Sequence, residues 1–84
     1  MPGLNDDISY KGIAYMVQTQ DLGLHSRGIE TTIYKKGELL LRRRFDYSHL
    51  LAQADFPMVL KNKLESMHRT ALSDVESGKF SSPA

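Results

Sequence analysis

Apolar and polar residues alternate along three stretches of the chain, and this alternation predicts three β-strands. Residues 11–19 form the first stretch, in which Tyr15 and Val17 share one apolar face. Residues 29–34 and 38–45 form the second and the third. Side chains that repeat with a period of two point to opposite faces of a strand. Taken in order, the three stretches predict an antiparallel meander.

The second and third predicted strands form a hairpin around Gly37, and two registers compete for it. A two-residue loop at 36–37 would pair Ile33 with Leu40 and would mix apolar and charged residues on one face. A three-residue loop with Gly37 in the left-handed conformation pairs Ile33 with Leu39 and separates the two kinds of residue. Because a slip of one residue exchanges the faces of a strand, the apolar pattern favours the three-residue loop.

A long helix is predicted from residue 57 to residue 77, because apolar residues recur there at spacings of three and four. Pro57 suits the first turn of a helix, and Gly78 suits its end. Residues 46–52 predict a short helical turn before it. The apolar stripe of the long helix consists of Leu60, Leu64, Met67, Ala71 and Val75.

The predicted fold class is therefore α+β: a three-stranded antiparallel β-meander, a short helical turn, and one long C-terminal helix packed on one sheet face. A single helix covers only one face of such a sheet, so the other face is predicted to be open. This face would carry Met16, Tyr34, Leu40 and Arg42. Methionine, tyrosine and arginine are enriched in the cores of protein interfaces. We therefore predict that these four residues bind a partner.

The length of 84 residues suits a single domain that spans residues 1–84. A domain this short buries only about 60% of the surface that its unfolded chain exposes, so its core is small. The chain has no cysteine, so no disulfide can supplement the core. Association with a second chain is the remaining way to stabilise so small a core. Residues 1–8 and 80–84 are rich in turn-forming residues and are predicted to be flexible.

The charged residues nearly balance, with 11 basic and 10 acidic side chains and a formal charge of +1. This balance provides no overall attraction to nucleic acid or to an anionic membrane. The hairpin nevertheless carries a candidate anion-binding set, which consists of Lys35, Lys36, Arg42 and Arg44. Strand alternation divides this set, and Tyr34 is its only obvious aromatic neighbour. Binding of RNA or an anionic nucleotide through the hairpin is the alternative prediction.

No catalytic or metal-binding constellation can be assembled from the sequence. His25 and His49 each have a serine neighbour, but no Gly-x-Ser-x-Gly turn supports a nucleophile. We predict that His25 lies in a loop, His49 is packed or caps a turn, and His68 lies on the helix surface. Glu65 and His68 have a spacing seen in carboxylate-bridged metal sites, but further ligands are missing. No enzyme activity, metal or cofactor is therefore expected.

The sequence predicts a cytoplasmic location. The longest apolar run, Ile13–Val17, is far too short to span a bilayer. The first residues are acidic, whereas a secretory signal begins with basic residues and continues with apolar ones. A cytoplasmic protein without membrane binding is expected.

The segment 15–23 reads Tyr-x-Val-Gln-Thr-x-Asp-Leu-Gly. Together with the glycine hairpin at Gly37 and the Met67-His68-Arg69 sequence in the predicted helix, it resembles a small bacterial domain family of no known activity. The resemblance implies a bacterial cytoplasmic protein and adds no catalytic residue.

A polar patch lies where the first predicted strand ends, and it consists of Gln18, Thr19 and Asp21. Short polar side chains at such positions hydrogen-bond to nearby backbone groups. We predict that this patch holds the following loop.

The leading hypothesis is a non-enzymatic protein-interaction module that self-associates as a homodimer, through the open sheet face or through a strand edge. A different protein as the partner is also compatible with that face. Nucleic-acid binding ranks second, and a small enzyme ranks third.

Overall fold

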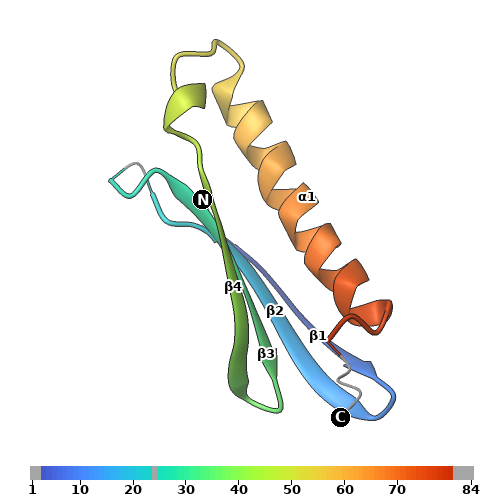
Figure 1. Ribbon diagram of the computed structural model, residues 1–84. Helices are drawn as coiled ribbons and strands as arrows, with labels where there is room; N and C mark the ends of the chain where they lie inside the picture. Colours follow the sequence, from blue (N-terminus) through green and yellow to red (C-terminus); the bar gives the residue numbers. More distant parts are fainter. Residues whose placement is uncertain (1–2, 24, 81–84) are drawn as a thin grey trace.

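Four antiparallel strands form one sheet, and a long helix lies across one of its faces (Figure 1). The computed structural model describes residues 3–23 and 25–80. The elements are β1 (Leu4–Tyr10), β2 (Ile13–Asp21), β3 (Gly28–Lys35), β4 (Glu38–Asp46), the 3₁₀ turn η1 (Ser48–Leu50) and α1 (Phe56–Glu76). The strands lie side by side in chain order, so the predicted α+β meander with one C-terminal helix is confirmed.

The sheet has four strands, so the prediction of three is wrong. The additional strand, β1, is formed by residues that were predicted to be a flexible lead-in. A turn at Lys11 and Gly12, with φ angles of 50° and 80°, joins it to β2. The centre of β1 is polar because it is an edge strand, and most of its residues are exposed. Residues 1–2 and 81–84, also predicted to be flexible, lie outside the described residues, whereas Phe80 packs against the core.

The hairpin between β3 and β4 has neither of the two registers that the sequence suggested. Lys36 and Gly37 form a two-residue turn, and their φ angles of 53° and 83° are typical of the type I′ turn that suits a twisted hairpin. The turn pairs Tyr34 with Leu39, but Ile33 then pairs with Leu41. Leu40 is left as a bulge. The bulge returns Leu41 to the face that carries Ile33, which places both on the helix side.

Replacing Gly37 by alanine is expected to lower the free energy of unfolding by about 1–2 kcal/mol, the cost of left-handed backbone in a residue with a Cβ. A Cβ at this position would meet no atom within 4 Å, so the backbone effect is isolated. Urea denaturation measures the change, with Glu38→Ala at the neighbouring exposed position as the control. Equal midpoints for the two variants would contradict the expectation.

The core lies between the sheet and α1, in two adjoining clusters. One cluster contains Tyr15, Val17, Ile33, Ala71 and Val75, and the other contains Ile29, Tyr47, Leu60 and Leu64. The predicted apolar stripe of the helix therefore faces the sheet. Ile29, Ile33 and Leu41 lie on the covered face as predicted, while Met16 and Tyr34 point away from it. Leu39, which the three-residue loop placed on the covered face, lies on the outer face instead, because the two-residue turn pairs it with Tyr34. The expectation that one helix covers one sheet face is confirmed.

The helix has the amphipathic character of a core-packing element. It begins at Phe56 with Pro57 in its first turn, and Gly78, with a φ angle of 81°, follows its end. In the described part of the chain, no helix combines the length and the apolar character needed to cross a membrane.

Candidate protein-interaction face

The sheet face opposite α1, which we call the outer face, brings together side chains from all four strands. Register places Met16 of β2 directly opposite Tyr34 of β3. Asp7 of β1 lies on the other side of Met16, and Leu39 of β4 lies on the other side of Tyr34. These four residues form one row across the sheet. Leu39 and the neighbouring bulge residue Leu40 keep 48% and 41% of their surface exposed, which is high for leucine.

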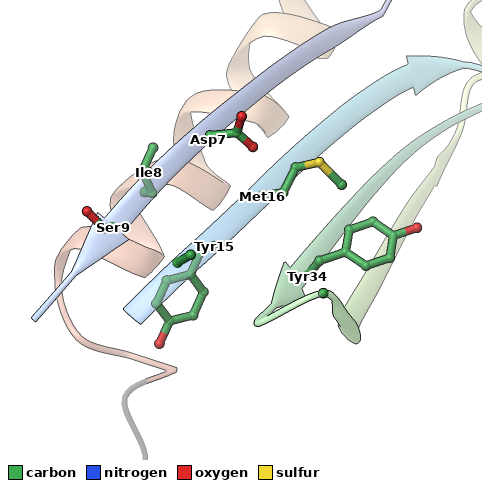
Figure 2. Close-up of a pocket in the computed structure, with 8 residues that line it drawn as sticks. Asp7, Ile8, Ser9, Tyr15, Met16 and Tyr34 are labelled. Carbon is green, nitrogen blue, oxygen red and sulfur yellow. The ribbon is translucent and has the colours of Figure 1, made fainter. Parts of the chain in front are cut away.

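A groove of about 730 Å³ opens along this row (Figure 2). Its lining residues are Asp7, Ile8, Ser9, Ala14, Tyr15, Met16, Tyr34 and Gly37. Figure 2 shows Met16 and Tyr34 projecting on the same side of the sheet. The sequence identified these two residues from the alternation in their strands. The sequence did not identify Asp7 and Ser9 as lining residues, because they belong to β1, which was not predicted.

The two arginines of the outer face both have partners within the protein. Arg42 and Arg44 project from β4, and Glu30 projects from the neighbouring strand β3. The Nε of Arg42 lies 3.7 Å from Oε1 of Glu30, and an Nη2 hydrogen of Arg44 is donated to the carbonyl oxygen of Ser26 at 2.8 Å. Glu30 contacts Arg42 although the register sets Glu30 opposite Arg44.

The predicted anion-binding set is not brought together. Lys35 points to the helix side, where its Nζ donates to the carbonyl oxygen of Phe80 at 3.1 Å and lies 5.9 Å from the centre of the Tyr15 ring. Lys36 is exposed in the turn. Only Arg42 and Arg44 share the outer face, so this face carries two of the four cations.

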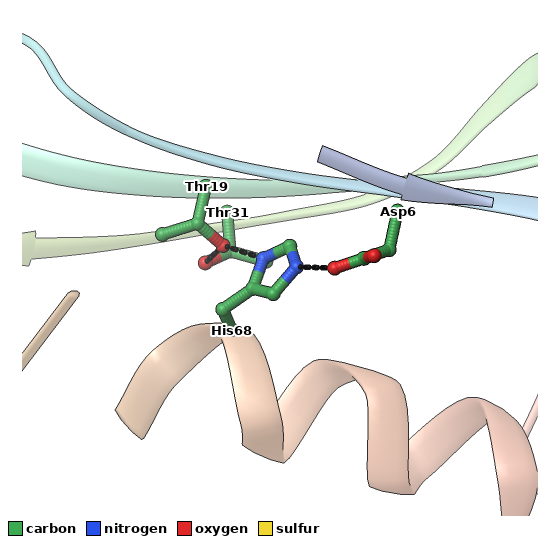
Figure 3. A network of polar contacts seen from close by, with 4 residues as sticks. All are labelled: Asp6, Thr19, Thr31 and His68. Carbon is green, nitrogen blue, oxygen red and sulfur yellow. Dashed lines mark hydrogen bonds and ion pairs between the residues drawn. The ribbon is translucent and has the colours of Figure 1, made fainter. Parts of the chain in front are cut away.

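A second polar feature, a network of hydrogen bonds, lies between the helix and the sheet (Figure 3). The Oγ1 atoms of Thr19 and Thr31 are 2.8 Å apart, and Thr19 Oγ1 is 2.8 Å from Nδ1 of His68. Nε2 of His68 is 2.7 Å from Oδ2 of Asp6. His68 is only 4% exposed, so its predicted position on the helix surface is wrong. These hydrogen bonds connect α1 to β1, β2 and β3.

The order hydroxyl, imidazole, carboxylate has the composition of a nucleophile–base–orienter triad, but its geometry excludes that role. The side chain of Thr19 has 0% exposed surface, so no substrate can reach its Oγ1. A neutral His68 that donates from Nε2 to Asp6 accepts the Thr19 hydrogen at Nδ1. Thr19 in turn accepts the Thr31 hydrogen, so every hydrogen has an acceptor. The hydrogen-bond network therefore has a structural role: it holds the helix against the sheet.

His68 is a residue that the sequence could have placed correctly. It follows Leu64 by four positions and precedes Ala71 by three, so it falls within the buried stripe. The spacing of Glu65 and His68 does not create a metal site, because both ring nitrogens of His68 already take part in hydrogen bonds. Among residues 3–23 and 25–80, no group of three or more metal-ligating side chains is gathered in one place.

The end of β2 is held by Asp21, as predicted for the polar patch. Its Oδ1 accepts hydrogen bonds from the backbone N–H of Gly23 at 2.9 Å and from the Tyr47 hydroxyl at 2.8 Å. Tyr47 is fully buried. Burial, together with the Asp21 carboxylate, raises the pKa of Tyr47 from 10.0 to about 12. Asp21 thus joins the loop after β2 to the segment after β4.

This shift predicts a loss of stability in alkali. Because the pKa of Tyr47 is raised in the folded protein, the neutral Tyr47 side chain adds to the free energy of unfolding. This stabilisation is fully present below pH 10 and disappears as the pH rises through about 12. The free energy of unfolding of the wild type should therefore fall more between pH 10 and pH 12 than that of Tyr47→Phe. Chemical denaturation at several pH values measures both. Parallel profiles for the two proteins would contradict the expectation.

Comparison with known proteins adds no relative: no family model matches the chain, and searches of curated proteins and of solved structures return no match.

Proposed function

We propose that this protein is a non-enzymatic protein-interaction module that forms a homodimer through its outer face. The observation that carries the proposal is the row of Met16, Tyr34 and Leu39 on a face that no described element covers, with a groove beside it. Burying this row would also enlarge the apolar core of a small domain.

The outer face is complementary to itself. A two-fold axis parallel to the strands, passing between β2 and β3, would set Met16 of one copy against Tyr34 of the other. Contacts between a thioether and an aromatic ring are favourable. The same axis lays β4 over β1 of the other copy, so that Leu39 faces Asp7 and Arg42 faces Asn5. The margins of the interface are therefore more polar than its centre.

Two-fold pairing through a strand edge is much less favourable. Such a dimer would pair β1 with β1 or β4 with β4 in antiparallel fashion. The centre of β1 carries Asp6 and Asp7, and the centre of β4 carries Arg42, Arg43 and Arg44. Like charges that lie opposite each other destabilise paired strands. Edge charges of this kind also prevent aggregation, so the outer face is the better site for a homodimer.

The size of the outer face predicts a modest affinity. Four strands at about 4.8 Å spacing, each about 26 Å long, give roughly 500 Å² per copy and roughly 1,000 Å² in total. This total lies near the lower limit for a specific interface. The dimer is therefore expected to depend on concentration in the micromolar range.

Sedimentation equilibrium tests the proposal. Leu40→Glu should raise the dimer dissociation constant about tenfold or more, because the charge would be buried in the interface, while the far-UV circular dichroism stays unchanged. Met58→Glu is the matched control, because Met58 is 65% exposed and lies on the helix. A wild type that remains monomeric at high micromolar concentration would contradict self-association. Unfolding of Leu40→Glu would contradict the assignment of its face.

The alternative, binding of RNA or an anionic nucleotide through Arg42 and Arg44, has weaker support. Both arginines already have protein partners, and Lys35 faces the other way. Titration with a short single-stranded RNA at two salt concentrations separates the two functions. Binding that weakens with salt and is lost in Arg42→Ala would favour RNA binding.

A further inference from the structure

We propose that the two edges of the sheet are complementary to each other, so that β1 of one copy pairs with β4 of the next copy. This contact is made along the strand edges, where Asp7 and Arg42 border the outer face, and it does not require the homodimer. Among the described residues, β1 and β4 each pair with only one strand, so each presents a free edge. The β1 edge is acidic and the β4 edge is basic.

The orientation of the strands permits this pairing without rearrangement. Because every strand of the sheet is antiparallel to its neighbour, a copy placed alongside in the same orientation presents β1 antiparallel to β4. Both sheets then keep their helices on the same side. Four strands occupy about 19 Å and a helix with its side chains has a diameter of about 10–12 Å, so neighbouring helices do not collide.

One register satisfies the side chains on both faces. On the helix side it pairs Leu4 with Phe45, Asp6 with Arg43, and Ile8 with Leu41. On the outer side it pairs Asn5 with Arg44 and Asp7 with Arg42. A shift of two residues in either direction would oppose an apolar side chain to a charged one on the helix side. Register in sheets is specified by patterns of this kind.

The charged groups in this register are accessible. The Asp6 side chain is 54% exposed and uses Oδ2 for His68, which leaves Oδ1 for a second donor. The Arg42 side chain is 58% exposed. Arg43, which binds Asp74 at 2.7 Å, still exposes 32% of its side chain at the edge. A guanidinium has five N–H donors and can serve two carboxylates at once.

The contact is head-to-tail, so it generates rows or rings of copies rather than a closed two-fold dimer. Because it relies on exposed ion pairs, it should weaken as salt is added. Charge reversal on one edge removes it, and compensating reversals restore it.

Light scattering on proteins that carry Tyr34→Glu tests the inference, because this change in a central strand removes the outer-face contact and leaves both edges intact. In this background the protein should form salt-sensitive species larger than a monomer. In this register Asp7→Arg places a cation opposite Arg42, and Arg42→Asp places an anion opposite Asp7, so each variant alone should associate at least about tenfold more weakly. An equimolar mixture of the two should associate again.

Asp55→Arg is the control, because it makes the same charge change as Asp7→Arg at an exposed position outside the sheet, and it should associate like the background. A background protein that stays monomeric at low salt, or a mixture that stays monomeric, overturns the edge contact. Neither result affects the outer-face homodimer, which is measured in the wild type and in Leu40→Glu.

Discussion

Replacing Leu64 by alanine is expected to lower the free energy of unfolding by about 2–5 kcal/mol, which is the range for removing a buried leucine side chain. Leu64 is 1% exposed and packs in the cluster with Ile29 and Tyr47. A domain of this length has a total stability of about 4–13 kcal/mol. The variant should therefore be partly unfolded at room temperature or melt far below the wild type.

Met58→Ala provides the matched control on the same helix. Met58 is 65% exposed, so its truncation should change the stability by no more than about 0.5 kcal/mol. Urea denaturation of the three proteins gives the comparison. Equal losses in the two variants would mean that the covered face of the helix has been assigned incorrectly.

Replacing His68 by alanine is expected to lower the free energy of unfolding by about 2–4 kcal/mol. The substitution opens a cavity beneath the helix and removes a hydrogen-bond partner of the buried Thr19 hydroxyl. It also removes the hydrogen bond from Nε2 to Asp6, which ties β1 to α1. Hydrogen exchange should show the faster opening of β1 as well as the global loss.

Two changes in β1 separate the parts of this network. Asp6→Asn keeps an oxygen that can accept from Nε2, so it should cost no more than about 1 kcal/mol, as expected for an exposed carboxylate. Asp7→Asn, on the opposite face of the same strand, should have little effect on stability. A loss below 1 kcal/mol in His68→Ala would contradict the structural role of the network.

The sequence predicted the parts of the fold that repeat with a fixed period. The 3.6-residue period of α1 and the alternation in β2 and β3 assigned buried apolar side chains correctly, as Leu64, Val17 and Ile33 show, but not the buried His68. β1 was missed because an exposed edge strand needs few apolar residues, and Asp6 and Asp7 occupy its centre. Periodicity reports burial, so an element that is largely exposed leaves a weak signal.

Register and long-range contacts were also beyond the sequence pattern. Three consecutive leucines follow Glu38 at the start of β4, and their chemistry does not reveal that Leu40 is the bulge. The hydrogen-bond chain joins Asp6, Thr19 and Thr31 to His68, and these positions are separated by up to 62 residues. Such contacts depend on how the elements pack, which no local spacing encodes.

For the interaction face, alternation correctly placed Met16, Tyr34 and Arg42 on one side of the sheet. It could not supply Asp7, because the strand that carries this residue was not predicted. Lys35 was grouped with the arginines on the basis of sequence proximity, although its parity in β3 directs it to the helix side. The alternation of side chains along the strands therefore predicted the residues of the outer face better than the clustering of charged residues in the sequence did.

The central claim is that the outer face meets a second copy of the chain. Isotope-filtered NMR on a mixture of labelled and unlabelled protein tests it most directly, because it detects only contacts between copies. We expect intermolecular nuclear Overhauser effects between the Met16 methyl group and the Tyr34 ring. Intermolecular effects confined to the exposed surface of α1, including Met58, or none at high protein concentration, would contradict the claim.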